Sequence, residues 1–208
     1  MSKNVKIYQL GSSILRKISK PIDVNKSLPL VLNNNNNNNE VSKCVNNLII
    51  ALDNFRAKNG YGRGIAANQV GQDLRIVVLN LGNGPSFPIF NPEITYKSPE
   101  TFYLYDDCLS LDNGETLYRV ERHKEVKIKF IDIDGNQQKW NTLDMATSEL
   151  LQHELDHLDG VLSIDRAINS SKAKEQDIDV SQIDRNEFVT NMDFYKSFVD
   201  DYVILPTT

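Results

Sequence analysis

The chain has 208 residues, of which 40% are hydrophobic and 25% are charged, and its net charge is −5 with an isoelectric point near 5.2. An acidic chain without Lys/Arg clusters is a poor partner for nucleic acids and anionic membrane surfaces, and no apolar run approaches the roughly 20 residues of a membrane span. We therefore expect one globular domain over residues 1–208, with no direct nucleic-acid binding and no membrane contact.

The N-terminus leads within a few residues into domain-like sequence, so we expect neither a signal peptide nor a transit peptide. The two cysteines, Cys44 and Cys108, are too few for a disulfide framework. Cys44 falls in a helical pattern and is interpreted as a small core residue. The cytoplasm is therefore the expected compartment.

An unbroken asparagine run at residues 33–39 cannot bury apolar surface and is predicted to be a disordered loop. Apolar residues then recur at helical spacing from Val41 to Phe55, and Asn59-Gly60 is a helix-ending signal. The sequence predicts a helix here.

Short strand patterns follow. Residues 74–79 form an apolar run suited to a buried strand, and strands are also expected at residues 102–105 and 117–120. Val126, Ile128 and Phe130 alternate with lysines, and Asp134-Gly135 predicts a hairpin that leads into residues 137–140. Strands grouped between two helices favour an α+β fold with an antiparallel sheet.

The second helix is predicted to start near Asn141 or Thr142, which can cap it, and to close at Gly160. It contains His153-Glu154-Leu155-Asp156-His157, which has the pattern H-E-x-x-H. Side chains four apart lie on one helix face, so the two imidazoles can bind one metal ion while the glutamate handles the proton of a water. Two core histidines with backbone partners are the alternative.

A catalytic metal site usually has three protein ligands and one open position. Cys108 follows the strand-like residues 102–105, and its thiolate is a strong soft ligand. It is the candidate third ligand. The polar residues 169–185 and the apolar positions between Phe188 and Leu205 are predicted to form a C-terminal extension over residues 169–208, with a loop, a short helix and a final strand.

Three segments, in this order, resemble the three motifs of the peptide deformylase family: residues 62–69, Cys108-Leu109-Ser110 and residues 152–157. The resemblance covers about residues 5–168. It implies a deformylase-like α+β fold, with antiparallel sheets packed around a central metal-binding helix. It also implies a metal-dependent amide hydrolase whose partners are N-formylmethionyl peptides, including nascent chains at the ribosome, and whose product is a deformylated N-terminal methionine.

The resemblance also assigns residue roles. Cys108, His153 and His157 would bind a divalent metal, Fe2+ in the working enzyme with Zn2+, Ni2+ or Co2+ as substitutes. Glu154 would be the base. The side-chain amide of Gln69 and the backbone N–H of Leu109 would stabilise the oxyanion. Gly62 and Gly64 would let the peptide backbone approach closely, and Arg63 between them is interpreted as a solvated side chain.

The second motif departs from the family. Asp106-Asp107 stands where the family usually has Glu-Gly, and Asp112 stands where a proline is usual. Asp107 is expected at the rim of the substrate cleft. This motivates an alternative function, a deformylase-like amidase with another acyl substrate. An H-E-x-x-H endopeptidase and a catalytically inactive metal-binding homologue are further alternatives.

Two other polar side chains have open interpretations. Asp156 either hydrogen-bonds a ligand or an arginine such as Arg122, or is an ordinary surface carboxylate. His123 is interpreted as a surface residue because its neighbours are polar.

Overall fold

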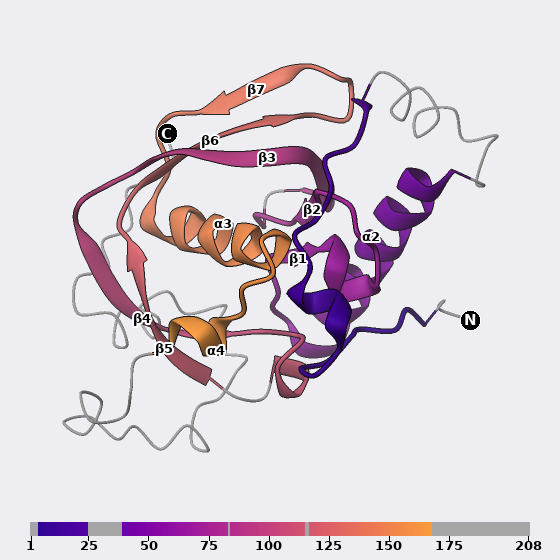
Figure 1. Ribbon diagram of the computed structural model, residues 1–208, viewed down its shortest axis with the longest axis horizontal. Helices are drawn as coiled ribbons and strands as arrows, with labels where there is room; N and C mark the ends of the chain where they lie inside the picture. The colour runs from indigo at the N-terminus through magenta and orange to yellow at the C-terminus, as the bar shows by residue number, and fades with distance from the viewer. Residues whose placement is uncertain (1–3, 25–38, 83, 115–116, 168–208) are drawn as a thin grey trace.

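The computed structural model of the protein describes residues 4–24, 39–82, 84–114 and 117–167 (Figure 1). The predictions for the asparagine run at 33–39, apart from Asn39, and for the extension at 169–208 lie outside these ranges. Asn39 caps the helix that starts at Glu40, accepting a hydrogen bond from the backbone N–H of Val41 at 3.2 Å, so the prediction of a disordered loop is wrong at this residue. Within them, no helix is long and apolar enough to cross a membrane.

The described chain forms an α+β fold with two antiparallel sheets. The larger sheet has five strands in the order β1-β2-β3-β6-β7. Its strands are β1 (Gly64–Ala66), β2 (Ile76–Leu79), β3 (Phe87–Lys97), β6 (Val126–Ile131) and β7 (Gln137–Trp140). The smaller sheet pairs β4 (Thr101–Asp107) with β5 (Leu117–His123).

Helix α3 (Met145–Leu158) lies at the centre, between the larger sheet and the β4–β5 hairpin (Figure 1). Helix α2 (Glu40–Asn59) packs against β1 and β2. The short helical segments are η1 (Ser13–Arg16), η2 (Ala67–Val70), η3 (Asp112–Gly114) and α4 (Ser163–Arg166). The predicted fold class, with antiparallel sheets packed around a central helix, is confirmed.

The apolar run of strand β2 is explained by its burial, because all four of its residues are buried. Ile76 and Val78 belong to the hydrophobic cluster that includes Leu48 of α2, whereas Val77 belongs to the cluster that includes Leu151 of α3. Successive side chains of a strand point to opposite faces, so a strand covered on both faces has no polar alternation. Strand β6 has one covered face, and its residues alternate between buried and half-buried.

The predicted helix start at Asn141 or Thr142 is wrong. Helix α3 begins at Met145, and the Asp144 side chain is its cap, accepting a hydrogen bond from the backbone N–H of Thr147 at 2.6 Å. Gly160 does follow the helix in a left-handed conformation, with φ of 74°. Strand β3 was not predicted from periodicity because Pro88, Asn91 and Pro92 interrupt its pattern. Asn91 has a positive φ of 49°. Its side-chain amide accepts a hydrogen bond from the backbone N–H of Ile22 and donates one to the carbonyl of Ile22, and these two bonds hold Asn91 in place.

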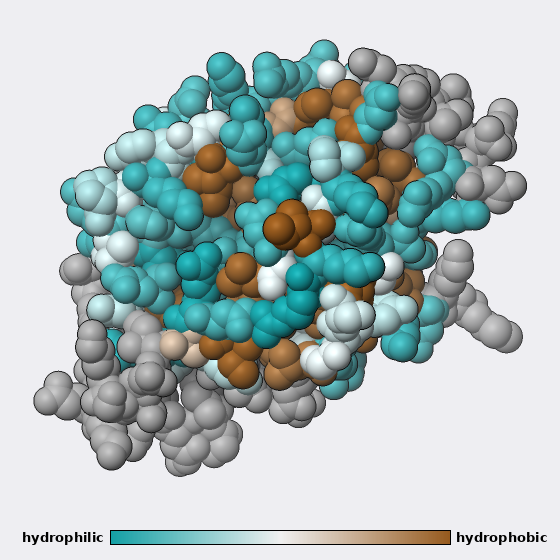
Figure 2. All heavy atoms as spheres, viewed as in Figure 1, coloured by the Kyte–Doolittle hydropathy of each residue, from teal (hydrophilic) through white to brown (hydrophobic). Residues whose placement is uncertain are grey.

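Exposed hydrophobic side chains are scattered rather than gathered. The face shown in Figure 2 is largely hydrophilic, with its hydrophobic residues in separate groups. Large side chains among the more exposed ones include Leu10, Ile18 and Leu81. Cys44 is fully buried in the cluster beside α2, so its interpretation as a core residue is confirmed.

Candidate metal centre and substrate cleft

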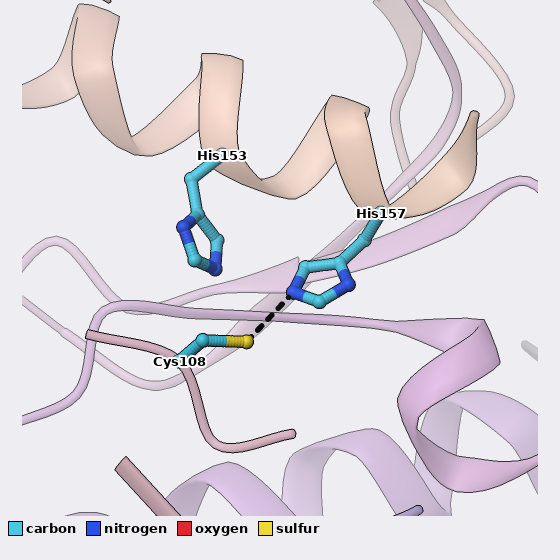
Figure 3. A group of neighbouring side chains, drawn as sticks. All are labelled: Cys108, His153 and His157. Atoms are coloured by element: carbon cyan, nitrogen blue, oxygen red, sulfur yellow. Dashed lines mark hydrogen bonds between the residues drawn. The ribbon is translucent and has the colours of Figure 1, made fainter. Parts of the chain in front are cut away.

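The side chains of Cys108, His153 and His157 point toward one another (Figure 3). One ligand atom from each lies within 4.8 Å of the other two, and all three residues are buried. The Cys108 Sγ atom is 3.2 Å from Nε2 of His157. Cys108 directly follows β4, while both histidines lie on one face of α3. Strand and helix thus bring together the three residues predicted as metal ligands.

The donor set fits a divalent transition metal. One thiol and two imidazoles are ligands that zinc, iron, cobalt and nickel all accept. Burial lowers the pKa of His157 well below its usual value, with the charge of His153 adding to the effect, so its ring is neutral as a ligand must be. Burial also raises the pKa of the Cys108 thiol, and a bound cation is what would keep that sulfur deprotonated.

Asp106 orients the ring of His153 through its Nδ1 atom. Its carboxylate lies 2.9 Å from Nδ1 of His153 and accepts a hydrogen bond from Nη2 of Arg122 at 2.8 Å. Burial alone would raise the pKa of Asp106, but the charges of His153 and Arg122 outweigh it and hold that pKa well below the usual range. Burial would lower the pKa of His153, but the charge of Asp106 outweighs it and raises that pKa well above its usual value, so a metal at this site would displace the proton on Nε2. The ionised Asp106 keeps the other hydrogen on Nδ1, toward its carboxylate.

Sequence reasoning missed this role and noted Asp106 only as a departure from the family. The signal was present in the strand period, because Phe102, Leu104 and Asp106 share one face of β4 and all three are buried. A carboxylate on the inner face of a strand needs a partner, and the nearest motif residue was Cys108.

Arg122 is itself nearly fully buried, and it also donates to Asp156. Of the two interpretations of Asp156, the structure supports the contact with Arg122. Arg166 donates to the same carboxylate at 2.7 Å. Asp156 is therefore connected to the Asp106–His153 contact through Arg122, which donates to both carboxylates. His123 is half-buried, with Nδ1 2.6 Å from the carbonyl of Ser98, so it is a partly exposed residue with a backbone partner.

Glu154 is 3% exposed and its Oε2 atom has no hydrogen-bond partner among the described residues. Burial raises its pKa to about 7, which suits a group that takes and returns a proton near neutrality. Gly64 makes room for it, since a Cβ atom at Gly64 would lie 2.4 Å from Oε1 of Glu154. Gly62 has a left-handed φ of 121°, and its Cβ would lie 2.8 Å from the ring of Phe55.

Gln69, in η2, is held by both ends of its amide. Its Oε1 atom accepts a hydrogen bond from the backbone N–H of Ala66 at 2.8 Å, and Nε2 donates to Oγ of Ser110 at 3.2 Å. Nε2 also lies 3.9 Å from the Cys108 sulfur. The amide donors are thus fixed beside the three candidate ligands, with Leu109 between Cys108 and Ser110.

A cavity of about 110 Å³ opens beside these residues. It is lined by Phe55, Tyr61, Gly62, Arg63, Gly64, Gln69, Asp106, Asp107, Leu109, Glu149, Leu150, His153 and Glu154. The structure therefore places every predicted catalytic and substrate-binding residue on one cleft. Asp107, the last residue of β4, is half-buried in its wall.

Arg63 does not fit its interpretation as a solvated side chain. Its Nη1 atom donates to the carbonyl of Ala146 at 2.9 Å, and its Nη2 atom forms an ion pair with Glu149. Glu149 is only 2% exposed, and sequence reasoning did not single it out. The two residues are far apart in the chain, so no local pattern indicated the pair.

Comparison with known proteins finds one family over most of the chain. The family model described as polypeptide deformylase matches residues 4–173. The chain is similar to peptide deformylase 2 of Clostridium perfringens, at 34% identity over 164 residues that cover 78% of this chain and 92% of that protein.

Solved structures agree with these sequence matches. The crystal structure of the Thermotoga maritima peptide deformylase has 32% identity and a TM-score of 0.63, covering 79% of this chain and 98% of that one. A peptide deformylase from Synechococcus elongatus in complex with actinonin has 25% identity and a TM-score of 0.67, covering 84% and 85% of the two chains.

Proposed function

The chain belongs to the polypeptide deformylase family, whose metal-dependent members remove the formyl group from the N-terminal methionine of nascent peptides, and we propose that Cys108, His153 and His157 hold its metal while Glu154 transfers the proton. The observation that carries this proposal is the convergence of the three ligand atoms within 4.8 Å, next to a cavity that His153 and the buried Glu154 line together.

The metal, when bound, acidifies a water molecule and polarises the formyl carbonyl. Glu154 accepts a proton from the attacking water and gives it to the amine nitrogen as the C–N bond breaks. The amide hydrogens of Gln69 and the backbone N–H of Leu109 donate to the oxygen on which negative charge develops. Water and formyl peptide thereby become formate and a free N-terminal amine.

The metal of the working enzyme is proposed to be Fe2+, as the family resemblance implies. A thiolate and two imidazoles would also accept Zn2+, Ni2+ or Co2+ as substitutes. The proposed site of action is the cytoplasm, on formylated chains that emerge from ribosomes. Gly62, Gly64 and Asp107 line the cleft that would receive the peptide.

The experiment is formate release from a formyl-Met peptide by protein purified without oxygen, with its metal content measured in the same sample. We expect formate in proportion to bound metal, and recovery with Fe2+ after chelation. Full activity in metal-free protein would contradict the proposed centre. Cleavage of internal peptide bonds, without formate, would instead support the endopeptidase alternative.

Asp107 motivates a prediction about the residues that follow the formylated one. Its carboxylate should favour a peptide with lysine there over one with glutamate, and Asp107→Gly should remove that preference. The expected size is modest, about 1 kcal/mol or less, and salt should reduce it. The measurement is the ratio of kcat/KM for the two peptides, at low and high salt, in both proteins. An equal ratio in both would show that Asp107 does not act on the substrate's charge.

A further inference from the structure

The cleft contains a half-buried ion pair that formyl hydrolysis does not require. Arg63 precedes β1 and Glu149 lies in the first half of α3, and both line the cavity that also holds His153 and Glu154. The Glu149 side chain is 2% exposed, whereas that of Arg63 is 34% exposed. Burying a charged pair is costly and adds little stability compared with apolar residues of similar size. This pair sits where a substrate would touch it.

The position of the pair relative to the reacting centre is fixed by the helix. Glu149 precedes His153 by four residues, so it lies slightly more than one helical turn, roughly 6 Å along the axis, from that histidine on nearly the same face. In a formyl peptide the first side chain branches from the carbon bonded to the formylated nitrogen. With the formyl group beside Glu154, that side chain would extend into the cavity that the pair lines.

Part of the remaining wall is apolar. Phe55, Tyr61 and Leu150 line the same cavity, and the two rings pack edge to face with centroids 5.1 Å apart. The recess therefore offers apolar contact along its sides and a guanidinium–carboxylate pair as a polar element. A side chain with an apolar stem and a hydrogen-bonding end matches both.

The energetic distinction lies at the end of the first side chain. A purely aliphatic end would remove water from the partly exposed Arg63 side chain and put nothing polar in its place, which costs free energy. An end with a hydrogen-bond acceptor replaces that water. A thioether sulfur is a weak acceptor, and an amide oxygen is a stronger one.

Resting on the function proposed above, we propose that Arg63 and Glu149 determine which first side chain the enzyme accepts. The pair favours side chains that end in a hydrogen-bond acceptor. Methionine is accepted and glutamine is favoured over aliphatic side chains. Norleucine, an aliphatic chain of methionine's length, is disfavoured.

The test compares formyl-Gln, formyl-Met and formyl-norleucine peptides that are otherwise identical. The informative variant is Arg63→Leu combined with Glu149→Leu, because removing both partners leaves no unpaired buried charge. The ratio of kcat/KM for glutamine over norleucine should fall by about tenfold or more, the usual worth of a hydrogen bond to a charged group. The matched control, Lys129→Leu with Glu93→Leu, removes a surface ion pair of 2.8 Å outside the cleft and should leave the ratio unchanged.

A single substitution provides an independent check. Glu149→Gln keeps the shape of the side chain but leaves the charge of Arg63 without its carboxylate, so formyl-Glu peptides should gain over formyl-Gln peptides. Circular dichroism and metal content verify that each variant folds. Unchanged ratios in both the double and the single variant would overturn the role of the pair.

Binding separates this proposal from the catalytic one. Calorimetric affinities of the unformylated glutamine and norleucine peptides should show the same change between wild type and the double variant. If metal-loaded wild type hydrolysed none of the formyl peptides, the proposed function would fall, while the affinities would still decide what Arg63 and Glu149 recognise. Equal relative affinities in both proteins would overturn the inference whatever the turnover.

Discussion

Glu154→Gln is expected to lower the rate of formyl-peptide hydrolysis by about 10²- to 10⁴-fold, the usual contribution of general acid–base catalysis, and to leave the metal content at the wild-type level. The substitution preserves the length of a side chain that is tightly enclosed, with Gly64 against it. It removes the group that accepts the proton. Glu154 is not one of the three proposed metal ligands.

The measurement is kcat for formate release, with metal content determined on the same protein. Glu121→Gln is a suitable control, because this exposed glutamate of β5 lies outside the cavity lining. It accepts a hydrogen bond from the hydroxyl of Thr101 at 2.6 Å. It should retain wild-type turnover. A Glu154→Gln variant that works at the wild-type rate would show that another group carries the proton.

Cys108→Ser is expected to lose the metal and, with it, the activity. A hydroxyl is a harder and far less acidic ligand than a thiol, so it binds these metals poorly. Substituting a residue that only hydrogen-bonds a metal ligand already lowers metal affinity by about 10- to 100-fold. Replacing a ligand itself should lower metal affinity further. Metal content after dialysis against a chelator, compared with wild type, measures the effect.

The second cysteine provides the matched control. Cys44→Ser makes the same chemical change in the apolar cluster beside α2, away from the cleft. It should keep the metal but lose stability, on the order of 1–3 kcal/mol for a buried hydroxyl without a partner. If Cys108→Ser retained its metal as Cys44→Ser does, Cys108 would not be a ligand.

These two predictions concern residues that the sequence indicated in different ways. His153, Glu154 and His157 are neighbours in a helix, so their spacing alone places them together. Cys108 is 45 residues before His153 and was proposed from its chemistry and from the family resemblance. The structure adds its distance of 3.2 Å from His157, which the packing of β4 against α3 produces.

Local periodicity determined the second helix, the buried strand β2 and the alternating strand β6, because each of these patterns depends only on residues close in the chain. It did not determine β3, where prolines and the Asn91 bulge hide the strand period. It also misplaced the start of α3, because Asn141, Thr142 and Asp144 are all capable caps and only the folded chain selects Asp144.

Two contacts are visible only in the tertiary structure. Asp106 meets His153 across 47 residues, and Arg63 meets Glu149 across 86. A strand period can show that Asp106 is buried, but the partner in such a pair leaves no mark in a single sequence, since a charged residue has the same identity whether it faces water or a buried partner. The cost of leaving the buried carboxylates of Asp106 and Glu149 unpaired is what holds Asp106 against His153 and Arg63 against Glu149, on the wall of one cavity.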